Sequence, residues 1–380
     1  DSTNNNGILG LDKSNGMQKK ILITFLFKEG AGPVFTLEMS RGLAQNGCEI
    51  HALLSSKISN RKDWENEKSF KSVTFIETGT RKTAIQATLS FFFNEKYKLK
   101  RMFQKKTFDY IISTFYHPWS TTVFKCFEAR KKIVICHDPI HHSGVGLLEK
   151  WMTTHYIKTA SDIIVLTQSF IPIIEKRFGY SKEHIHYMPH GRMSTYKQQN
   201  TTAPQTDCKN INFLFFGRIE EYKGLHILGK AYKKLVQSYS NISMTVAGSG
   251  DFSKYDSMFK ELPQVDIVNR YIEDKEIDNY FSIPNTILVL PYLDASQSGV
   301  IPVALEYKIP IIASDAGGLK EQMNNGDFGL FFQPGNANAL MQQMEYAVKH
   351  PEFLAIEKKK MAEYLKTLNW DVVTRKVIQI

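Results

Sequence analysis

Short runs of β-branched and aromatic residues alternate with stretches of helical spacing, and this alternation constrains the fold more than any other feature. Before residue 193 the runs typical of strands are Lys20–Phe27, Glu49–Ser55, Ser72–Glu77, Asp109–Ser113, Lys132–His137, Asp162–Leu166 and His184–Pro189. Stretches such as Phe35–Gln45 and Leu147–Thr159 carry apolar residues at helical spacing. The alternation predicts right-handed βαβ units and a parallel sheet covered by helices on both faces.

The pattern stops in the polar segment 193–210 and then restarts. Further strands are expected at Ile211–Phe216, Ser243–Ala247, Val265–Asn269, Thr286–Leu290, Pro310–Ser314 and Gly329–Phe332. A length of 380 residues suits two domains. We therefore expect an α/β fold with two Rossmann-like doubly wound domains, 17–192 and 211–367, joined by a linker over 193–210. Residues 1–16 are expected to be a disordered leader or a cloning scar.

Composition excludes several classes of protein. With 42% hydrophobic and 23% charged residues, the chain is neither disordered nor a coiled coil. No apolar run approaches the ~20 residues that a bilayer span needs, and we expect no secretion signal. The four cysteines form no CxxC pair or metal spacing, so we expect reduced thiols and a cytoplasmic protein.

The positive charge is concentrated in the first half of the chain. Residues 1–200 hold 29 Lys and Arg against 17 Asp and Glu, a net charge of +12, whereas the remainder holds 19 against 21, a net charge of −2. Segment 81–106 has eight cations, one acid and interleaved aromatic residues, which suits a helix on an anionic membrane face. An ordinary solvated basic helix is the alternative, and no nucleic-acid-binding motif is present. The expected membrane contacts are Lys98, Lys100, Arg101, Lys105 and Lys106.

Unusual chemistry recurs where strands of the second half end, which is where doubly wound sheets bind ligands. After strand Ile211–Phe216, Gly217 permits a sharp turn, and Arg218 and Lys223 lie on one short loop that opens a helix. Two cations at a helix N-terminus suit a diphosphate. The alternative is an ordinary βα turn with two solvated cations.

A second loop of this kind follows strand Thr286–Leu290. The N–H groups of Ser298, Gly299 and Val300 could hold sugar hydroxyls or phosphate oxygens. Glu306, farther along the expected helix, could accept two ribose hydroxyls or could simply face solvent.

The first half offers a glycine loop and a histidine at strand ends. Gly30 and Gly32 follow the first strand, but the loop lacks the third glycine of a nicotinamide-binding fingerprint. His137 closes a strand and could donate a hydrogen bond to a substrate or be purely structural. A zinc site that uses His137, Asp138, His141 and His142 is conceivable, but the ligand spacing does not support it.

Taken together, five segments resemble the retaining glycosyltransferases of family 4, which have the GT-B fold. These segments are GRIEEYKG, the loop that runs to Glu306, PIIASDAGG, the HDP strand end and the PHG turn, and the resemblance covers 17–380. It implies two Rossmann-like domains, a nucleotide-sugar held mainly by the second domain, no cofactor and no metal. It also implies that a final helix, 368–380, packs back on the first domain.

The family's functional residues can be carried over one by one. Arg218 and Lys223 match its diphosphate-binding pair, Glu306 matches the second Glu of its Glu-x7-Glu motif, and His137 matches a histidine near the transferred sugar. The glycine loop at Gly30 and Gly32 would approach the donor phosphate. The base would be held near Asn269, Tyr271 and Ile272.

One departure from the family pattern leaves the sugar contacts open. Ser298 stands eight positions before Glu306, where the family has its first Glu, and the nearest carboxylate is Asp294. Either Asp294 replaces that Glu as a catalytic residue, or N–H groups of Ser298–Val300 hold the sugar, or the enzyme is weakened or dead.

The expected activity is transfer of a sugar from a UDP- or GDP-sugar to a hydroxyl of a sugar, lipid-linked or protein-linked acceptor. Synthesis of a polysaccharide, glycolipid or glycoprotein glycan would use such an activity. The alternatives are a phosphorylase or epimerase of GT-B fold and a non-catalytic GT-B partner subunit.

Overall fold

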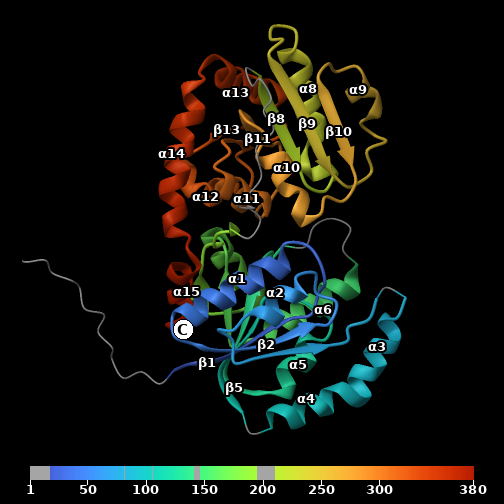
Figure 1. The fold of residues 1–380 in the computed structure, drawn as a ribbon, viewed down its shortest axis with the longest axis vertical. Coiled ribbons are helices and arrows are strands. Elements are labelled where there is room, and N and C mark those ends of the chain that lie inside the picture. The colour runs from blue at the N-terminus through green and yellow to red at the C-terminus, as the bar shows by residue number, and fades with distance from the viewer. Residues whose placement is uncertain (1–17, 81, 105, 141–145, 195–209) are drawn as a thin grey trace, which may run out of the picture.

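The protein forms two α/β domains, one above the other in the view of Figure 1. The computed structural model describes residues 18–80, 82–104, 106–140, 146–194 and 210–380. The expected leader, nearly all of the expected linker, and Lys105, His141 and His142 lie outside the described residues.

The first domain contains a parallel sheet of seven strands in the order β3-β2-β1-β4-β5-β6-β7. Its strands are β1 (Lys20–Phe25), β2 (Glu49–Ser55), β3 (Ser72–Ile76), β4 (Thr107–Ser113), β5 (Glu128–Cys136), β6 (Asp162–Val165) and β7 (Ile185–Tyr187). Its helices are α1 (Gly32–Gln45), α2 (Arg61–Asn66), α3 (Ala84–Ser90), the π-helical η1 (Phe91–Glu95), α4 (Lys96–Phe103), α5 (Ser120–Cys126), α6 (Leu147–Lys158), η2 (Gln168–Phe170), α7 (Ile171–Phe178) and η3 (Lys182–His184).

The second domain contains a parallel sheet of six strands in the order β10-β9-β8-β11-β12-β13. Its strands are β8 (Ile211–Phe216), β9 (Ile242–Gly248), β10 (Val265–Asn269), β11 (Thr286–Leu290), β12 (Ile311–Ser314) and β13 (Leu330–Phe332). The helices that follow β8 are η5 (Glu221–Lys223), α8 (Leu225–Leu235), α9 (Asp256–Lys260), η6 (Asp274–Glu276), α10 (Ile277–Phe281), α11 (Val300–Tyr307), α12 (Leu319–Gln322), η7 (Asn324–Gly326), α13 (Ala337–Lys349), α14 (Glu352–Thr367) and α15 (Trp370–Ile378).

Burial on both sheet faces explains why the strands read as continuous apolar runs rather than as alternating ones. In β1, Ile21 and Ile23 pack with α1, whereas Leu22 packs with the opposite layer, which includes Phe91 and Leu99. The two doubly wound domains expected from the alternation are therefore confirmed.

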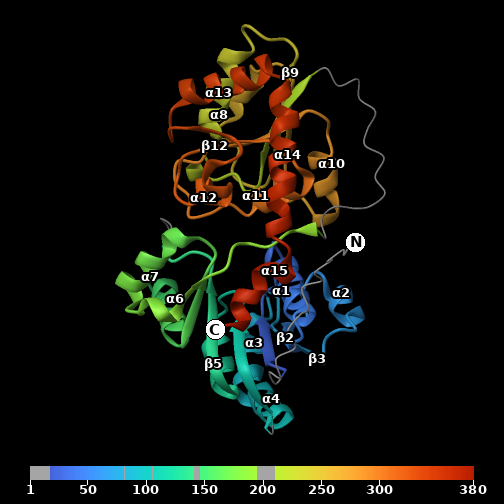
Figure 2. The same ribbon diagram turned by 90° about the vertical axis from the view of Figure 1, so that its left-hand side faces the viewer.

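The last two helices connect the domains. α14 lies along the second domain, and α15 continues into the first domain, where it packs on α1 (Figure 2). The indole Nε1 of Trp370 donates to the carbonyl of Arg192 at 2.6 Å, and Asn46 Nδ2 donates to the carbonyl of Asp371 at 2.7 Å. A Cβ on Gly191 would lie 2.4 Å from the Trp370 ring, so the PHG turn needs glycine for this close approach.

Both sheets reverse their strand order at one point, between β1 and β4 and between β8 and β11. Doubly wound sheets bind ligands outside the carboxyl ends of the strands at such a point. The loops after β1, β8 and β11 are therefore the place to look for a site. No helix among the described residues is long and apolar enough to cross a membrane.

Candidate functional site

A cavity of about 410 Å³ lies between the domains at these reversal points. The first domain contributes the loop after β1, and the second contributes the loops after β8, β9 and β10 and the start of α11. The lining residues are Gly30, Ala31, Phe216, Gly217, Arg218, Lys223, Gly248, Ser249, Tyr271, Ile272, Asp274, Ile277, Gly299, Val300 and Val303.

Glycines shape the turn after β8. Gly217 and Gly224 have φ values of +122° and +68°, which side chains rarely tolerate. A Cβ on Gly217 would lie 3.0 Å from Nζ of Lys223, and a Cβ on Gly224 would overlap the carbonyl of Pro291. Gly217 therefore leaves room for the Lys223 ammonium at the cavity, and Gly224 lets η5 approach the loop after β11.

The cavity holds a buried cation. Lys223 is only 9% exposed, and its ammonium lies 5.2 Å from the centre of the Tyr292 ring. Burial, and secondarily the nearby Arg218 guanidinium, lowers the pKa of Lys223. No carboxylate among the described residues forms an ion pair with Lys223, whereas the more exposed Arg218 pairs with Glu220 at 3.0 Å. A buried cation without an anionic partner is costly unless a ligand neutralises it.

The β10 side of the cavity is apolar and aromatic except for one acid. Tyr271 is exposed and Ile272 is buried, and both line the cavity as expected. Asp274 at the start of η6 also lines it, and burial raises the pKa of its carboxyl. Asn269 is exposed and is not among the lining residues.

Only part of the Ser298–Val300 loop is available to a ligand. The N–H of Ser298 donates to Gln322 Oε1 at 2.7 Å, and the N–H of Val300 donates to Ser298 Oγ at 3.3 Å. Ser298 is itself buried, and its Oγ lies 3.3 Å from the Tyr292 hydroxyl. Gly299 and Val300 line the cavity, whereas Ser298 supports them from behind.

The structure places Glu306 away from the cavity. Its buried carboxylate accepts two hydrogen bonds from Arg192, at 2.7 Å and 3.0 Å, and this pairing raises the pKa of Arg192. One turn earlier on α11, Val303 lines the cavity instead. Asp294 is exposed and is likewise not among the lining residues. Neither acid named from the sequence therefore reaches the cavity in this conformation.

His137 is half-buried on the first-domain side, next to the loop after β11. Its ring stacks on Phe115 with centroids 3.9 Å apart, and its carbonyl accepts from Gln297 Nε2 at 2.8 Å. Burial, with His190 nearby, lowers the pKa of His137 to about 3. Because Nε2 lies 2.9 Å from the Thr114 carbonyl, it carries the proton, and the neutral ring offers Nδ1 as an acceptor. This geometry does not favour the donor role expected from the sequence.

Two glycines of the first domain have different roles. Gly30 lines the cavity with a φ of +87°. Gly32 does not line it, and a Cβ there would lie 2.5 Å from the Phe25 ring, so Gly32 allows α1 to pack on β1.

Several lining residues were not anticipated as site residues. Gly248 and Ser249 belong to a glycine turn after β9, a signal visible in the sequence but weak by itself. Asp274, Ile277 and Val303 carry no such signal, because only the approach of three neighbouring strand ends brings them together.

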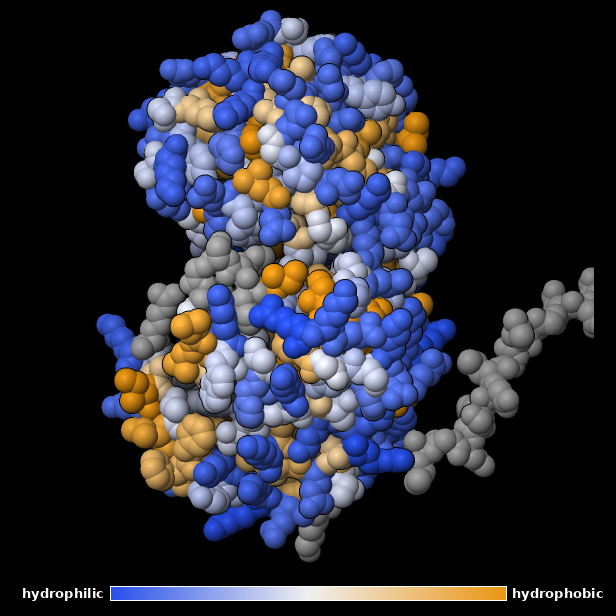
Figure 3. Space-filling model, turned by 180° about the vertical axis from the view of Figure 1, so that it is seen from behind, coloured by the Kyte–Doolittle hydropathy of each residue, from blue (hydrophilic) through white to orange (hydrophobic). Residues whose placement is uncertain are grey.

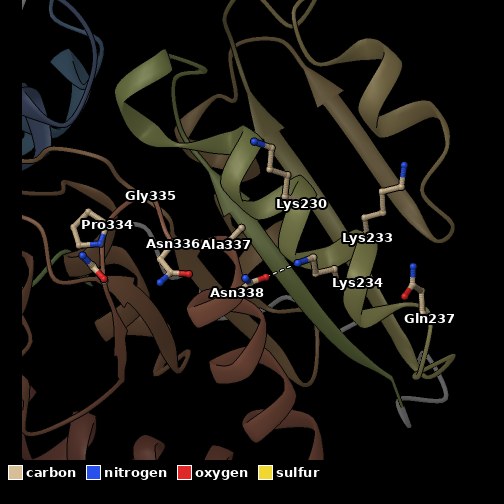
Figure 4. A pocket seen from close by; sticks show the side chains of 10 residues that line it. Lys230, Lys233, Lys234, Gln237, Pro334, Gly335, Asn336, Ala337 and Asn338 are labelled. Carbon is tan, nitrogen blue, oxygen red and sulfur yellow. Dashed lines mark hydrogen bonds between the residues drawn. The ribbon is translucent and has the colours of Figure 1, made fainter.

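A larger cavity, of about 810 Å³, lies on the second domain between α8 and the loop before α13. Figure 4 shows that Lys230, Lys233 and Lys234 point in different directions, and that Lys234 donates to Asn338. Lys233 pairs with Glu261 at 3.2 Å. The three lysine side chains of this cavity are therefore not arranged to bind one ligand together. The described residues also contain no group of three or more His, Cys, Asp or Glu that could hold a metal ion.

Two family models match successive parts of the chain. The model described as Glycosyltransferase Family 4 matches residues 32–192, and the model described as Glycosyl transferases group 1 matches residues 197–367. Together the two matches account for most of the chain.

Curated relatives are distant and only partly covered. A glycosyltransferase of Methanocaldococcus jannaschii, named uncharacterized, is 26% identical over 51% of this chain and 50% of its own length. A Klebsiella pneumoniae protein, named for its place in the cps region, is 23% identical over 58% of this chain and 63% of its own. Alpha-D-kanosaminyltransferase of Streptomyces kanamyceticus is 20% identical over 57% of each chain. The matches thus span about half to three fifths of these relatives.

Solved structures show the same fold over nearly the whole chain. A glycosyltransferase from Rickettsia africae superimposes with a TM-score of 0.69 at 16% identity, and covers 96% of this chain and 98% of its own. Sucrose-phosphate synthase from Thermosynechococcus elongatus superimposes with a TM-score of 0.73 at 16% identity, and covers 95% of this chain and 98% of its own. Anabaena HepE, solved with UDP-glucose, superimposes with a TM-score of 0.68 at 15% identity, and also covers 95% of this chain and 98% of its own. With its two parallel α/β sheets and both family matches, this chain belongs to the family 4 glycosyltransferases (glycosyl transferases group 1), which have the GT-B fold.

Proposed function

We propose that this chain transfers a sugar from a nucleoside diphosphate sugar to a hydroxyl acceptor, with retention of the anomeric configuration. The observation that carries the proposal is Lys223, a buried cation that lines the cavity between the domains and forms no ion pair with a carboxylate among the described residues. A diphosphate would supply the missing negative charge. Anabaena HepE, which shares this fold, was solved in complex with UDP-glucose, and this favours a UDP-sugar over a GDP-sugar.

The charges at the cavity suit the departure of a diphosphate. When the bond between the anomeric carbon and the phosphate oxygen breaks, negative charge grows on the diphosphate, and Lys223 and Arg218 are placed to stabilise it. The acceptor hydroxyl attacks the same face of the sugar, and its proton passes to the departing phosphate oxygen. Gly30 and Ala31 close the cavity from the first domain and help to exclude water, which would compete as an acceptor.

Replacement of the two cations tests this function. Lys223→Ala and Arg218→Ala should each reduce kcat/KM for transfer by about 30- to 1000-fold, the usual effect of losing one preorganised charge-stabilising group. Lys230→Ala on α8 is the matched control, because Lys230 lies in the other cavity and should leave turnover unchanged. Near wild-type turnover in both cavity variants would contradict the proposal.

A second function is consistent with one specific observation. Because Glu306 is held by Arg192 and Val303 takes its place at the cavity, no carboxylate of α11 is available to the donor. A donor-binding subunit without catalytic activity would tolerate that loss. Nucleotide-sugar binding by calorimetry together with no transfer and no donor hydrolysis would support the subunit and contradict the enzyme.

We further propose that the acceptor is presented at an anionic membrane surface. The continuous helical segment α3-η1-α4 exposes Ile85, Leu89 and Phe93 at four-residue spacing, with 78%, 53% and 72% of each residue exposed. Exposed Lys98, Lys100, Arg101 and Lys106 follow on the same segment and just after it. Leu147, Leu148 and Trp151 of α6 are also exposed. Figure 3 shows hydrophobic side chains gathered at the edge of the first domain, on the side where α3 and α6 lie in Figure 1.

Sedimentation with vesicles tests this placement. Each cation near an anionic leaflet contributes about 1 kcal/mol, so binding should be salt-sensitive and absent from neutral vesicles. Changing Lys98, Lys100, Arg101 and Lys106 to Gln should abolish binding to phosphatidylserine vesicles. Changing Lys230, Lys233, Lys358 and Lys359 of the second domain to Gln removes the same charge and should not. Equal losses in the two variants, or no binding by the wild type at low salt, would contradict a membrane contact here.

A further inference from the structure

The loop that connects β11 to α11 reaches the cavity between the domains at Gly299 and Val300. Ser298 directly precedes these two residues and is only 3% exposed. A buried N–H or C=O group outside a helix or strand needs a partner from elsewhere in the molecule, because leaving it unpaired is costly. The position of Ser298 therefore depends on the group that satisfies its main chain.

One side chain satisfies both main-chain groups of Ser298. The Ser298 N–H donates to Oε1 of Gln322 at 2.7 Å, and Nε2 of Gln322 donates to the Ser298 carbonyl at 3.1 Å. A primary amide carries its acceptor and its donors on one planar group, so the two bonds hold Ser298 much as a neighbouring strand would. Gln322 itself is half-buried at the end of α12 and does not line the cavity between the domains.

Twin glycines bring α12 close enough for this contact. A Cβ on Gly317 would overlap the carbonyl of Ala295, and a Cβ on Gly318 would overlap the carbonyl of Ser296. The turn between β12 and α12 therefore packs directly on the loop after β11, which larger residues at these positions would prevent. The Gly318 N–H also donates to the Ala295 carbonyl at 3.3 Å. The glycine pair of PIIASDAGG, which no step of the proposed transfer uses, thus forms the base from which Gln322 reaches Ser298.

A shift of Ser298 would disturb two walls of the cavity. Its Oγ accepts from the Val300 N–H at 3.3 Å and lies 3.3 Å from the Tyr292 hydroxyl. The centre of the Tyr292 ring in turn lies 5.2 Å from the Lys223 ammonium. Gln322 therefore supports, through Ser298, both the start of α11 and the aromatic ring beside the buried cation.

We infer that Gln322 is a positioning residue. It holds the main chain of Ser298 so that Gly299, Val300 and Lys223 are preorganised for the diphosphate of the donor. This inference rests on the proposed function, because it requires a diphosphate in the cavity. It adds a residue of α12 that acts on donor binding through the loop after β11 and not by direct contact.

Calorimetry with a nucleoside diphosphate tests the inference. UDP and GDP are titrated into the wild type first, and the one that binds more tightly is used with the variants. Gln322→Met removes both hydrogen bonds to Ser298 but keeps an unbranched side chain of similar length. A neutral hydrogen bond is typically worth about a factor of five, so the nucleotide should bind this variant about 10- to 30-fold more weakly. Gln342→Met on α13 replaces an exposed glutamine and is the matched control, for which we expect unchanged affinity.

Hydrogen exchange of the free protein shows whether the contact itself has been lost. The Ser298 amide should exchange faster in Gln322→Met than in the wild type, and at the wild-type rate in Gln342→Met. Gln322→Asn keeps an amide but is one methylene group too short to make both bonds. It should show the same faster exchange and weaker binding, even if Gln322→Met does not fold.

The outcomes separate positioning from a purely structural role. A lower melting temperature with unchanged nucleotide affinity in the Gln322 variants would overturn the inference but not the proposed function. Weaker binding without faster exchange of the Ser298 amide would also overturn it, because Gln322 would then act by another route. Failure of both UDP and GDP to bind the wild type would overturn the inference and the proposed function together.

Discussion

At the scale of single residues, the sequence could not decide whether Asp294 or Ser298 replaces the missing first Glu of the motif. Their different burial distinguishes the two. Asp294 is exposed, whereas Ser298 is buried and its Oγ lies 3.3 Å from both the Val300 N–H and the Tyr292 hydroxyl. Ser298→Ala should therefore reduce nucleotide affinity more than Asp294→Ala, by about 1 kcal/mol for each hydrogen bond lost. Calorimetric titration of both variants with UDP measures the difference. A larger loss in Asp294→Ala would instead place that carboxylate at the donor.

Three half-buried histidines give a second prediction at this scale. Burial lowers the pKa of His117 and of His190 to about 4 and that of His137 to about 3, against about 6.5 in an unfolded chain. Below pH 6.5 these histidines bind protons in the unfolded state but not in the folded state. The free energy of unfolding therefore decreases as the pH is lowered. Between pH 7 and pH 5 each histidine should remove up to about 2 kcal/mol from the free energy of unfolding.

Urea unfolding at several pH values measures this loss. His117→Gln should flatten the pH dependence between pH 7 and pH 5, whereas His155→Gln, which replaces an exposed histidine, should not. A free energy of unfolding that does not change over this range would show that the folded protein protonates the three rings as readily as the unfolded chain does.

At the scale of elements, the pairing of Glu306 with Arg192 ties α11 to the end of the first domain. Both guanidinium contacts are within 3.0 Å, and Arg192 N–H also donates to the Leu368 carbonyl at 3.0 Å. Breaking a buried ion pair leaves one charge unpaired, but Arg192 is a third exposed, which reduces the cost.

We therefore expect Glu306→Gln to lower stability by about 1–3 kcal/mol. Affinity for UDP should stay within about twofold, because a hydrogen bond to a charged group would be worth far more. Thermal unfolding and calorimetry measure the two effects. Unchanged stability with a large loss of affinity for UDP would show instead that Glu306 binds the ribose.

At the scale of the whole molecule, α15 couples the two domains through Trp370. Its ring lies 5.2 Å from that of Phe35, and its backbone lies against Gly42 of α1. One hydrophobic cluster contains residues of both sheets as well as Trp370, so the domains share part of their core.

Trp370→Ala should cost about 3–5 kcal/mol, as is usual for an aromatic residue removed from a core. Because the lost contacts join the domains, the scanning-calorimetry profile should change from one transition to two. Val372→Ala on the exposed side of the same helix is the control and should keep a single transition. One transition in both variants would show that other contacts couple the domains.

The sequence by itself determined the two parallel sheets, because apolar runs buried on both faces leave few alternative arrangements. It also identified the glycine turn with Arg218 and Lys223, since local spacing alone sets the geometry of that loop. It could not determine which acids reach the cavity. Whether Glu306, Val303 or Asp274 faces a ligand depends on the rotation of α11 and on the closeness of β8, β9 and β10, which are separated in sequence. Only the tertiary structure brings those strand ends together, and only it pairs Glu306 with an arginine 114 residues away.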